Sequence, residues 1–227
     1  MSPATHFFGS WLIASFTTAN PRDRKLVTWA GVLPDADGLG LVVDVVGALL
    51  TGSPIRFHYY QRFHHHLAHG WPAAIVIIAL LTCFARDRWR VALLCLVTFH
   101  VHLLCDLVGS RGPGPADLWP IAYGEPLFLR PVWWWRGQWR LDGWQKQTLS
   151  GIVFALNLWR ATTLGASCLE VFSARLDAAL VGILRKWRQA TVPARPHRIS
   201  ANTSGRRLPR GFSRATPRTS GALSSAS

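Results

Sequence analysis

The chain has 227 residues, of which 49% are hydrophobic, 16% are charged and 12 are tryptophan. This composition is too apolar for a typical soluble domain and favours a protein that associates with a membrane. The net charge of +14 is uneven, because ten lysines and arginines follow residue 184 without any acidic residue, which leaves +4 for the first 184 residues. The basic character therefore belongs to the C-terminal end of the chain.

The first apolar segment covers residues 3–19 and ends at the sequence NPRDRK. The pair Asn20-Pro21 is a strong helix stop, because the ring of a proline disfavours helical geometry at the residue before it. The chain then returns through LVTWAGVL to the acidic sequence PDADG. We therefore predict a helical hairpin with a basic turn. Its open end carries three polar side chains: His6, Asp35 and Asp37.

A second hairpin follows the sequence HHHLAH at residues 64–69, which holds four of the nine histidines. An apolar segment at residues 72–85 leads to a second basic turn, RDRWR, and then to VALLCLVTFHVHLLCDLV. At about 1.5 Å of rise per residue, His102 and Asp106 on this last segment lie far from the basic turn. Like the first hairpin, the second one places its polar residues opposite its basic turn.

The two hairpins together bring seven polar residues to one end of the predicted bundle: His6, Asp35, Asp37, His64, His69, His102 and Asp106. His102 and Asp106 are four residues apart and so share one face of a helix. Imidazole nitrogens and carboxylate oxygens suit a divalent metal, zinc first, with manganese or iron as alternatives. We predict a metal site in which all seven are candidate ligands and Asp35 or Asp37 acts as catalytic base. The alternative for His102 and Asp106 is a hydrogen-bonded core pair.

Five short motifs occur in a fixed order: TH-x-x-G at 5–9, GVLPDADG at 31–38, H-x-x-x-x-H at 64–69, HLLCD at 102–106 and LWP at 118–120. This order resembles the bacterial inner-membrane-associated, metal-dependent hydrolases called YdjM-like or LexA-binding hydrolases. The resemblance covers residues 2–120. It implies the same seven metal or catalytic residues and a location in the bacterial inner membrane, as a multi-pass or deeply associated protein.

The chain departs from this family at the histidine-rich motif. The family usually has HRGxTHS where this sequence has HHHLAHG, so His64 and His69 match the two family histidines. His65 or His66 are alternative ligands, because each would share a helix face with His69. The HxxxD helix also looks like that of zinc-dependent phospholipase C, which favours phosphate esters as the substrate class.

The C-terminal half carries three further segments. Residues 149–168 predict another apolar helix, and RPVWWWRGQWRLDGWQ places five tryptophans among arginines. Such a mixture suits the headgroup level of a membrane, with an aromatic nucleic-acid platform as the alternative. Residues 169–188 have the spacing of an amphipathic helix, which lies on a membrane surface or packs on the bundle. Residues 189–227 are poor in large apolar side chains, so we predict a disordered basic tail.

We therefore expect an all-α, membrane-embedded or membrane-associated helical bundle with a metal-site domain at 1–168, an amphipathic helix at 169–188 and a tail at 189–227. The predicted function is hydrolysis of an ester or phosphoester by a metal-activated water. One alternative is a non-catalytic metal-binding or transport protein. The other is a regulatory membrane adaptor whose tail binds an acidic protein or nucleic acid. The basic turns favour a cytoplasmic location for that end of the bundle, by the positive-inside tendency.

Overall fold

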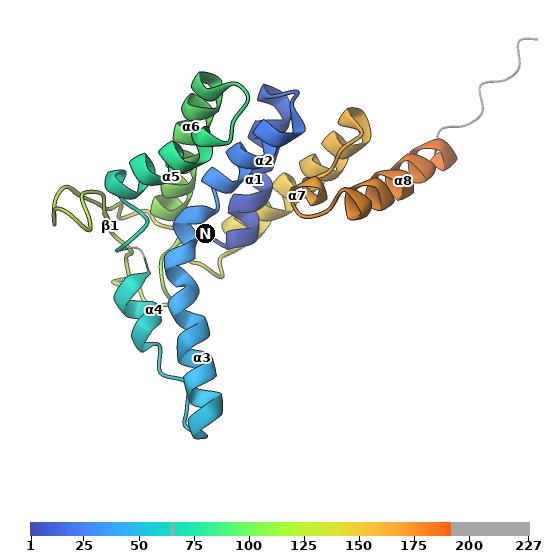
Figure 1. The fold of residues 1–227 in the computed structure, drawn as a ribbon. Coiled ribbons are helices and arrows are strands. Elements are labelled where there is room, and N and C mark those ends of the chain that lie inside the picture. Colours follow the sequence, from blue (N-terminus) through green and yellow to red (C-terminus); the bar gives the residue numbers. More distant parts are fainter. Residues whose placement is uncertain (65, 192–227) are drawn as a thin grey trace, which may run out of the picture. The chain divides into compact units, whose positions relative to one another are not determined.

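The computed structural model describes residues 1–64 and 66–191. The described part is mainly helical, with one sheet of two very short strands (Figure 1). The predicted all-α class is confirmed. The elements are α1 Pro3–Thr17, α2 Pro21–Ala30, η1 Leu33–Leu39, α3 Gly40–Thr51, α4 His58–Phe63, α5 Trp71–Cys83, α6 Arg88–Gly109, β1 Ile121–Ala122, β2 Val132–Trp133, α7 Trp144–Leu164, η2 Cys168–Val171 and α8 Ala174–Thr191, where η marks a 3-10 helix.

The first hairpin consists of α1 and α2. Each helix begins with a proline, and the residue before that proline is the N-cap. The Ser2 hydroxyl accepts a hydrogen bond from the Thr5 amide, and Asn20 Oδ1 accepts one from the Arg22 amide at 2.9 Å. Proline at the first helical position removes an amide that would have no partner inside the helix. α1 ends at Thr17, so the helix stop predicted at Asn20-Pro21 is confirmed.

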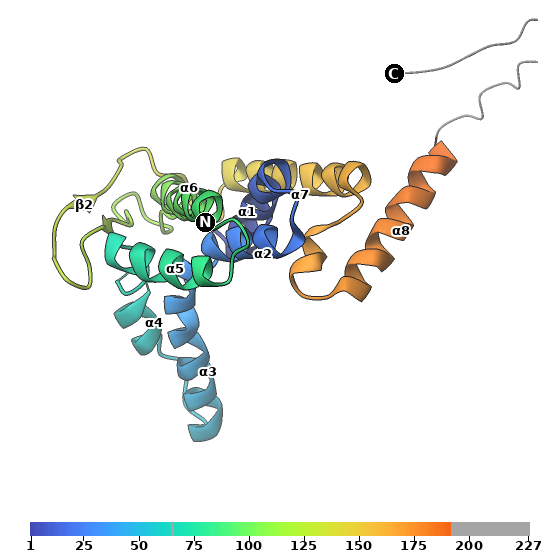
Figure 2. The ribbon, with the colours of Figure 1, turned by 45° about the horizontal axis from the view of Figure 1, so that its top comes forward.

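The second hairpin consists of α5 and α6, and one carboxylate joins its turn to the first hairpin. Asp23, in the first turn of α2, accepts hydrogen bonds from the backbone amides of Arg86 at 2.9 Å and Asp87 at 3.3 Å. The two basic turns therefore lie together at one end, as the sequence predicts, and Figures 1 and 2 show α2 beside α5 and α6. The opposite end is left for the polar residues.

Two small apolar clusters hold the hairpins together. Val27 of α2 packs with Val91 and Cys95 of α6, while Phe99 and Leu103 of α6 belong to a second cluster near α5. α1 and α2 approach so closely that a Cβ atom on Gly31 would lie 1.8 Å from the Ser10 hydroxyl oxygen. Only glycine fits at this position, which fixes the location of the Gly31 carbonyl.

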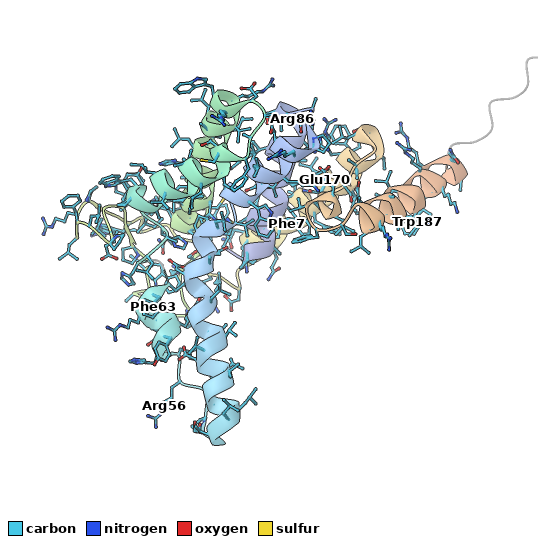
Figure 3. The ribbon with its side chains drawn as sticks, in the orientation of Figure 1. Phe7, Arg56, Phe63, Arg86, Glu170 and Trp187 are labelled. Atoms are coloured by element: carbon cyan, nitrogen blue, oxygen red, sulfur yellow. The ribbon has the colours of Figure 1, made fainter. Side chains whose placement is uncertain are left out.

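A pair of helices that the sequence analysis did not anticipate follows η1. The Asp44 carboxylate of α3 accepts hydrogen bonds from the amides of Tyr59 at 3.0 Å and Tyr60 at 2.9 Å, which ties α3 to the start of α4. Figure 1 shows α3 and α4 extending away from the two hairpins, and Figure 3 shows Arg56 near their far end. Large apolar side chains of α3 remain exposed, among them Leu49 and Leu50.

The C-terminal helices attach to the first hairpin through polar contacts. Asn157 of α7 donates to the Phe8 carbonyl at 3.0 Å. Glu170 of η2, labelled in Figure 3, forms a buried ion pair with Arg24 and accepts a hydrogen bond from the indole of Trp11 at 2.9 Å. These buried polar groups therefore have partners on different elements, as folded interiors require.

Three predicted boundaries shift in the C-terminal region. α7 covers residues 144–164, where the sequence predicted a helix at 149–168. The expected helix at 169–188 is divided into η2 and α8, and α8 continues to residue 191. Residues 189–191 of the predicted tail are therefore helical, and the rest of the tail, 192–227, lies outside the described residues.

Among the described helices, only α6 is long and apolar enough to cross a membrane. α5 is also apolar, but it has 13 residues, fewer than the roughly 20 that a span needs. The expectation of a multi-pass membrane protein is therefore not supported by helix length.

Candidate metal centre

The polar residues that the sequence predicts at one end of the bundle do meet there, and four chain segments supply them. His6 comes from the first turns of α1, Asp35 from η1, His69 from the loop before α5, and His102 and Asp106 from α6. All five are buried except Asp35, whose side chain is 11% exposed. One potential ligand atom from each of His6, Asp35, His102 and Asp106 lies within 4.8 Å of the others.

The side chains point their ligand atoms toward one another. Asp106 Oδ1 lies 3.1 Å from His6 Nε2, and Asp106 Oδ2 lies 3.1 Å from His102 Nε2. His69 Nε2 lies 3.6 Å from Asp106 Oδ2 and 3.2 Å from His102 Nε2. Asp35 Oδ1 completes the group at 3.7 Å from His102 Nε2 and 3.9 Å from His69 Nε2. The rings of His6 and His102 are stacked at 3.8 Å between centroids.

The partners of the histidine Nδ1 atoms fix which nitrogen carries the lone pair. His102 Nδ1 lies 2.9 Å from the Gly31 carbonyl, which can only accept, so His102 donates there and its Nε2 carries the lone pair when the ring is neutral. His69 Nδ1 lies 2.9 Å from Asp37 Oδ2, which gives His69 the same tautomer. Two lone pairs that face each other across 3.2 Å repel, and either a proton or a metal ion between the two nitrogens would remove this repulsion.

Asp37 lies behind the cluster and orients histidines. Its Oδ1 lies 2.9 Å from His64 Nδ1, its Oδ2 lies 2.9 Å from His69 Nδ1, and its Oδ2 also accepts from the Ala68 amide at 3.1 Å. Burial alone would raise the pKa of Asp37, but the hydrogen bonds from His64 and His69 lower it below its ordinary value. A carboxylate behind a ligating histidine is a common arrangement in metal sites, because it sets the tautomer and the ring orientation.

Two buried carboxylate oxygens test whether the residues fit a metal ion. Asp35 Oδ2 and Asp106 Oδ2 are buried and have no hydrogen-bond partner among the described residues. Burial raises the pKa of Asp35, although the charge of His69 opposes the shift. A buried carboxylate oxygen without a hydrogen-bond partner destabilises the folded state, and a cation bound to that oxygen would remove the penalty. Together with the facing imidazole nitrogens, these oxygens form a donor set that suits zinc, manganese or iron.

The seven predicted site residues thus divide into three kinds of position. Five form the cluster: His6, Asp35, His69, His102 and Asp106. Asp37 lies behind His69, and His64 contacts Asp37 through Nδ1. Asp37 therefore contacts the cluster through His69, and His64 is connected to it through Asp37.

The alternative ligands in the histidine-rich motif have other surroundings. His66 is 53% exposed, and its Nδ1 lies 2.5 Å from Glu125 Oε2. Residues 66–70 form turns and bends, so the helix face expected to join His66 with His69 does not exist. His65 lies outside the described residues.

Three further groups at the site were not predicted. The Ser110 hydroxyl donates to Asp106 Oδ1 at 3.1 Å, and the amino group of Met1 contacts the same carboxylate oxygen. Ser110 follows Asp106 by four residues, and that spacing on one helix face is the signal that could have identified it. The Gly31 carbonyl is a backbone group, so no residue type in the sequence indicates its role. Its position is explained by the close approach of α1 and α2.

A pocket of about 610 Å³ opens beside the cluster, with Asp35 and His64 in its wall.

Comparisons with protein-family models, with curated proteins and with solved structures give no match to this chain. Conclusions about function therefore depend on the geometry of the cluster and of this pocket.

Proposed function

We propose that the chain is a membrane-associated, metal-dependent hydrolase that acts on an ester or phosphoester. The observation that carries the proposal is the pair of facing lone pairs on His69 Nε2 and His102 Nε2, 3.2 Å apart. Two imidazole nitrogens fixed in this way are well placed to ligate a divalent metal ion, which supports the proposal. The resemblance of residues 2–120 to the YdjM-like hydrolases favours the same activity.

In this proposal the five cluster residues hold the metal and Asp37 orients His69. When bound, the ion would lower the pKa of a water molecule to about 7 and polarise the ester. His102 keeps its ring fixed by donating from Nδ1 to the Gly31 carbonyl. The ligand chemistry favours zinc, and manganese or iron would also fit these donors.

Asp35 is the carboxylate best suited to accept a proton during hydrolysis. Among the described residues its Oδ2 has no hydrogen-bond partner, and its side chain lines the neighbouring pocket, whereas both oxygens of Asp37 already accept hydrogen bonds. A water oxygen would bond to the carbonyl carbon or phosphorus while one water proton passes to Asp35 Oδ2. The ester bond to the bridging oxygen then breaks, and the alcohol leaves after it takes up that proton.

Exposed apolar side chains favour a membrane location for this proposed enzyme. They lie on α5 and α6 at Ile75, Val76, Leu80, Leu93, Leu96, Val97 and Leu104. Soluble monomers rarely expose large contiguous apolar patches, and a bilayer would cover these side chains. The two basic turns, near Arg22 and Arg86, would then lie at the cytoplasmic surface of a bacterial inner membrane, with α6 as the one described helix long enough to cross it.

The first test is metal content, measured by mass spectrometry on detergent-purified protein. We expect near-stoichiometric zinc, manganese or iron in the wild type and its loss from the double variant His102→Ala/Asp106→Ala. The matched control is His66→Ala/Glu125→Ala, which removes another histidine–carboxylate pair outside the cluster and should retain the metal. Equal metal content in the wild type and the His102/Asp106 variant would contradict the proposal.

Hydrolysis of 4-nitrophenyl esters and phosphoesters then separates an enzyme from a metal-binding or transport protein. We expect turnover in the wild type and its loss in Asp35→Asn at a metal concentration that saturates both proteins. Bound metal with no turnover on either substrate class, together with metal flux into liposomes, would favour transport. The pocket beside Asp35 is the observation that favours turnover, because a storage or transport site does not need room for an ester.

A further inference from the structure

The pocket beside the cluster is mostly apolar and has polar groups in only part of its wall. Apolar side chains line it, among them Trp29 of α2, Val32 before η1, Leu33 and Leu39 of η1 and Leu41 of α3. Its volume, about 610 Å³, falls in the range of pockets that bind small organic ligands. A small polar ester would leave this wall exposed to water, so the wall indicates a ligand with an apolar chain.

Two basic residues lie at the edge of the same region. Lys146, near the start of α7, lines this pocket and also a second hollow of about 450 Å³. Arg111, two residues after the end of α6, lines that second hollow too, and Leu141 belongs to both. The two hollows are therefore neighbours, and they share Lys146 and Leu141 in their walls.

Neither basic side chain forms an ion pair among the described residues, although the Asp142 carboxylate lines the second hollow together with both of them. No carboxylate of the described chain lies within ion-pair distance of Lys146 or Arg111, and Arg111 Nε is buried without a hydrogen-bond partner. The nearby carboxylate of Asp142 instead pairs with Arg140 at 2.7 Å. A buried guanidinium nitrogen without an acceptor is costly, and an anionic ligand at this edge would supply the acceptor.

We propose that these features together bind an anionic amphiphile, with its phosphate group at Arg111 and Lys146 and its alkyl chain against Leu33, Leu39 and Leu41. This inference rests on the proposed function, because Asp35 and His64 in the same wall would place the ester bond between head and chain beside the metal ligands. The substrate class is accordingly a phosphate ester of a long-chain alcohol or of a lipid.

Binding of a chemically simple ligand series tests the proposal without turnover. The probes are decyl phosphate, hexyl phosphate, decanol and inorganic phosphate, titrated by calorimetry in one non-ionic detergent into metal-saturated Asp35→Asn protein, which should bind decyl phosphate without hydrolysing it. The variants described next are made in the same background. We expect decyl phosphate to bind on the order of 100-fold more tightly than hexyl phosphate, from four buried methylenes at about 0.8 kcal/mol each. Decanol, which lacks the charged group, should bind at least about 10-fold more weakly than decyl phosphate.

Two pairs of matched variants locate the site. Lys146→Gln should weaken decyl phosphate about 10-fold, whereas Lys186→Gln on α8 should not change its affinity. Leu41→Asp should weaken it at least as much, whereas Leu50→Asp on the same helix should not, because Leu50 is 82% exposed and outside the pocket. All four variants should retain the wild-type metal content, which shows that each has folded around the cluster.

The outcomes separate this inference from the proposed function. Decanol or inorganic phosphate binding as tightly as decyl phosphate, or Lys146→Gln and Lys186→Gln behaving alike, would overturn the amphiphile site even if metal is present. Absence of metal from the wild type would instead overturn the metallohydrolase, whatever the affinity for decyl phosphate. Equal affinity for hexyl and decyl phosphate would remove the alkyl chain from the proposal.

Discussion

Asp37 Oδ2 lies 2.9 Å from His69 Nδ1, and this contact turns the other nitrogen of His69 toward His102. The second oxygen of Asp37, Oδ1, lies 2.9 Å from His64 Nδ1 and orients that ring in the same way. One carboxylate in a 3-10 helix thus orients two histidines of a loop more than twenty residues later in the chain. The relationship explains why the acidic sequence PDAD accompanies the histidine-rich motif: one aspartate faces the cluster and the other supports it.

Replacement of Asp37 by asparagine should lower the affinity for metal. An asparagine amide cannot accept from His64 and His69 at once, so the ring of His69 loses its fixed orientation. Loss of such a supporting carboxylate typically costs about 10- to 100-fold in metal affinity. Competition with a chelator measures this change, and Asp44→Asn, which alters a carboxylate that binds the Tyr59 and Tyr60 amides, should leave the affinity as in the wild type.

Metal affinity should also rise with pH in a way that depends on Asp35. Burial raises the pKa of Asp35 above its ordinary value, and a protonated carboxyl cannot ligate a metal. As the pH falls below neutral, the proton and the metal therefore compete for this group. In a plot of the logarithm of the metal affinity against pH, the slope should be lower by up to one in Asp35→Asn, because up to one fewer proton is released when the metal binds. Identical slopes in both proteins would show that Asp35 does not take part in binding.

Gly31→Ala should disturb the site from a distance. The new Cβ atom would lie 1.8 Å from the Ser10 hydroxyl, so α1 and α2 must separate and move the carbonyl that holds His102. We expect a lower midpoint of thermal unfolding and weaker metal binding. The double variant Gly31→Ala/Ser10→Gly removes both Ser10 side-chain atoms and should restore both properties, while Gly47→Ala, in open space, should not lower either one.

The buried ion pair between Arg24 and Glu170 should contribute to stability without affecting the metal. Glu170→Ala leaves the guanidinium of Arg24 buried and unpaired, and such a loss typically costs about 3–5 kcal/mol. The free energy of unfolding, measured by denaturant titration, should fall accordingly while the metal content stays constant. Asp142→Ala breaks the exposed pair with Arg140 and should change the unfolding curve little.

Local rules in the sequence predicted the two hairpins and the end at which their polar residues meet. The proline at residue 21 ends α1 by steric exclusion, and the constant helical rise places His102 and Asp106 away from the basic turn. Neither rule needs knowledge of the tertiary structure. For this reason seven candidate residues, which include the five of the cluster, could be selected before their distances were known.

The roles within the cluster could not be derived in this way. In PDAD the two carboxylates are two residues apart at a turn, and their separate directions depend on the 3-10 geometry of η1. The pair α3 and α4 was missed for a similar reason. An apolar run such as LVVDVVGALL has no clear period, and α4, with six residues, is held by the long-range contact of Asp44.

The carboxylate of Asp23 at the turn between α5 and α6 has a consequence for the order of events during synthesis of the chain. His6, Asp35 and His69 all precede this turn, yet the carboxylate of Asp106 lies 100 residues after His6. A nascent chain that ends before α6 therefore presents three potential ligands without the helix that completes them. In the proposed metal centre the full ligand set would exist only after the second hairpin has docked on the first, so binding of the ion would report that docking step.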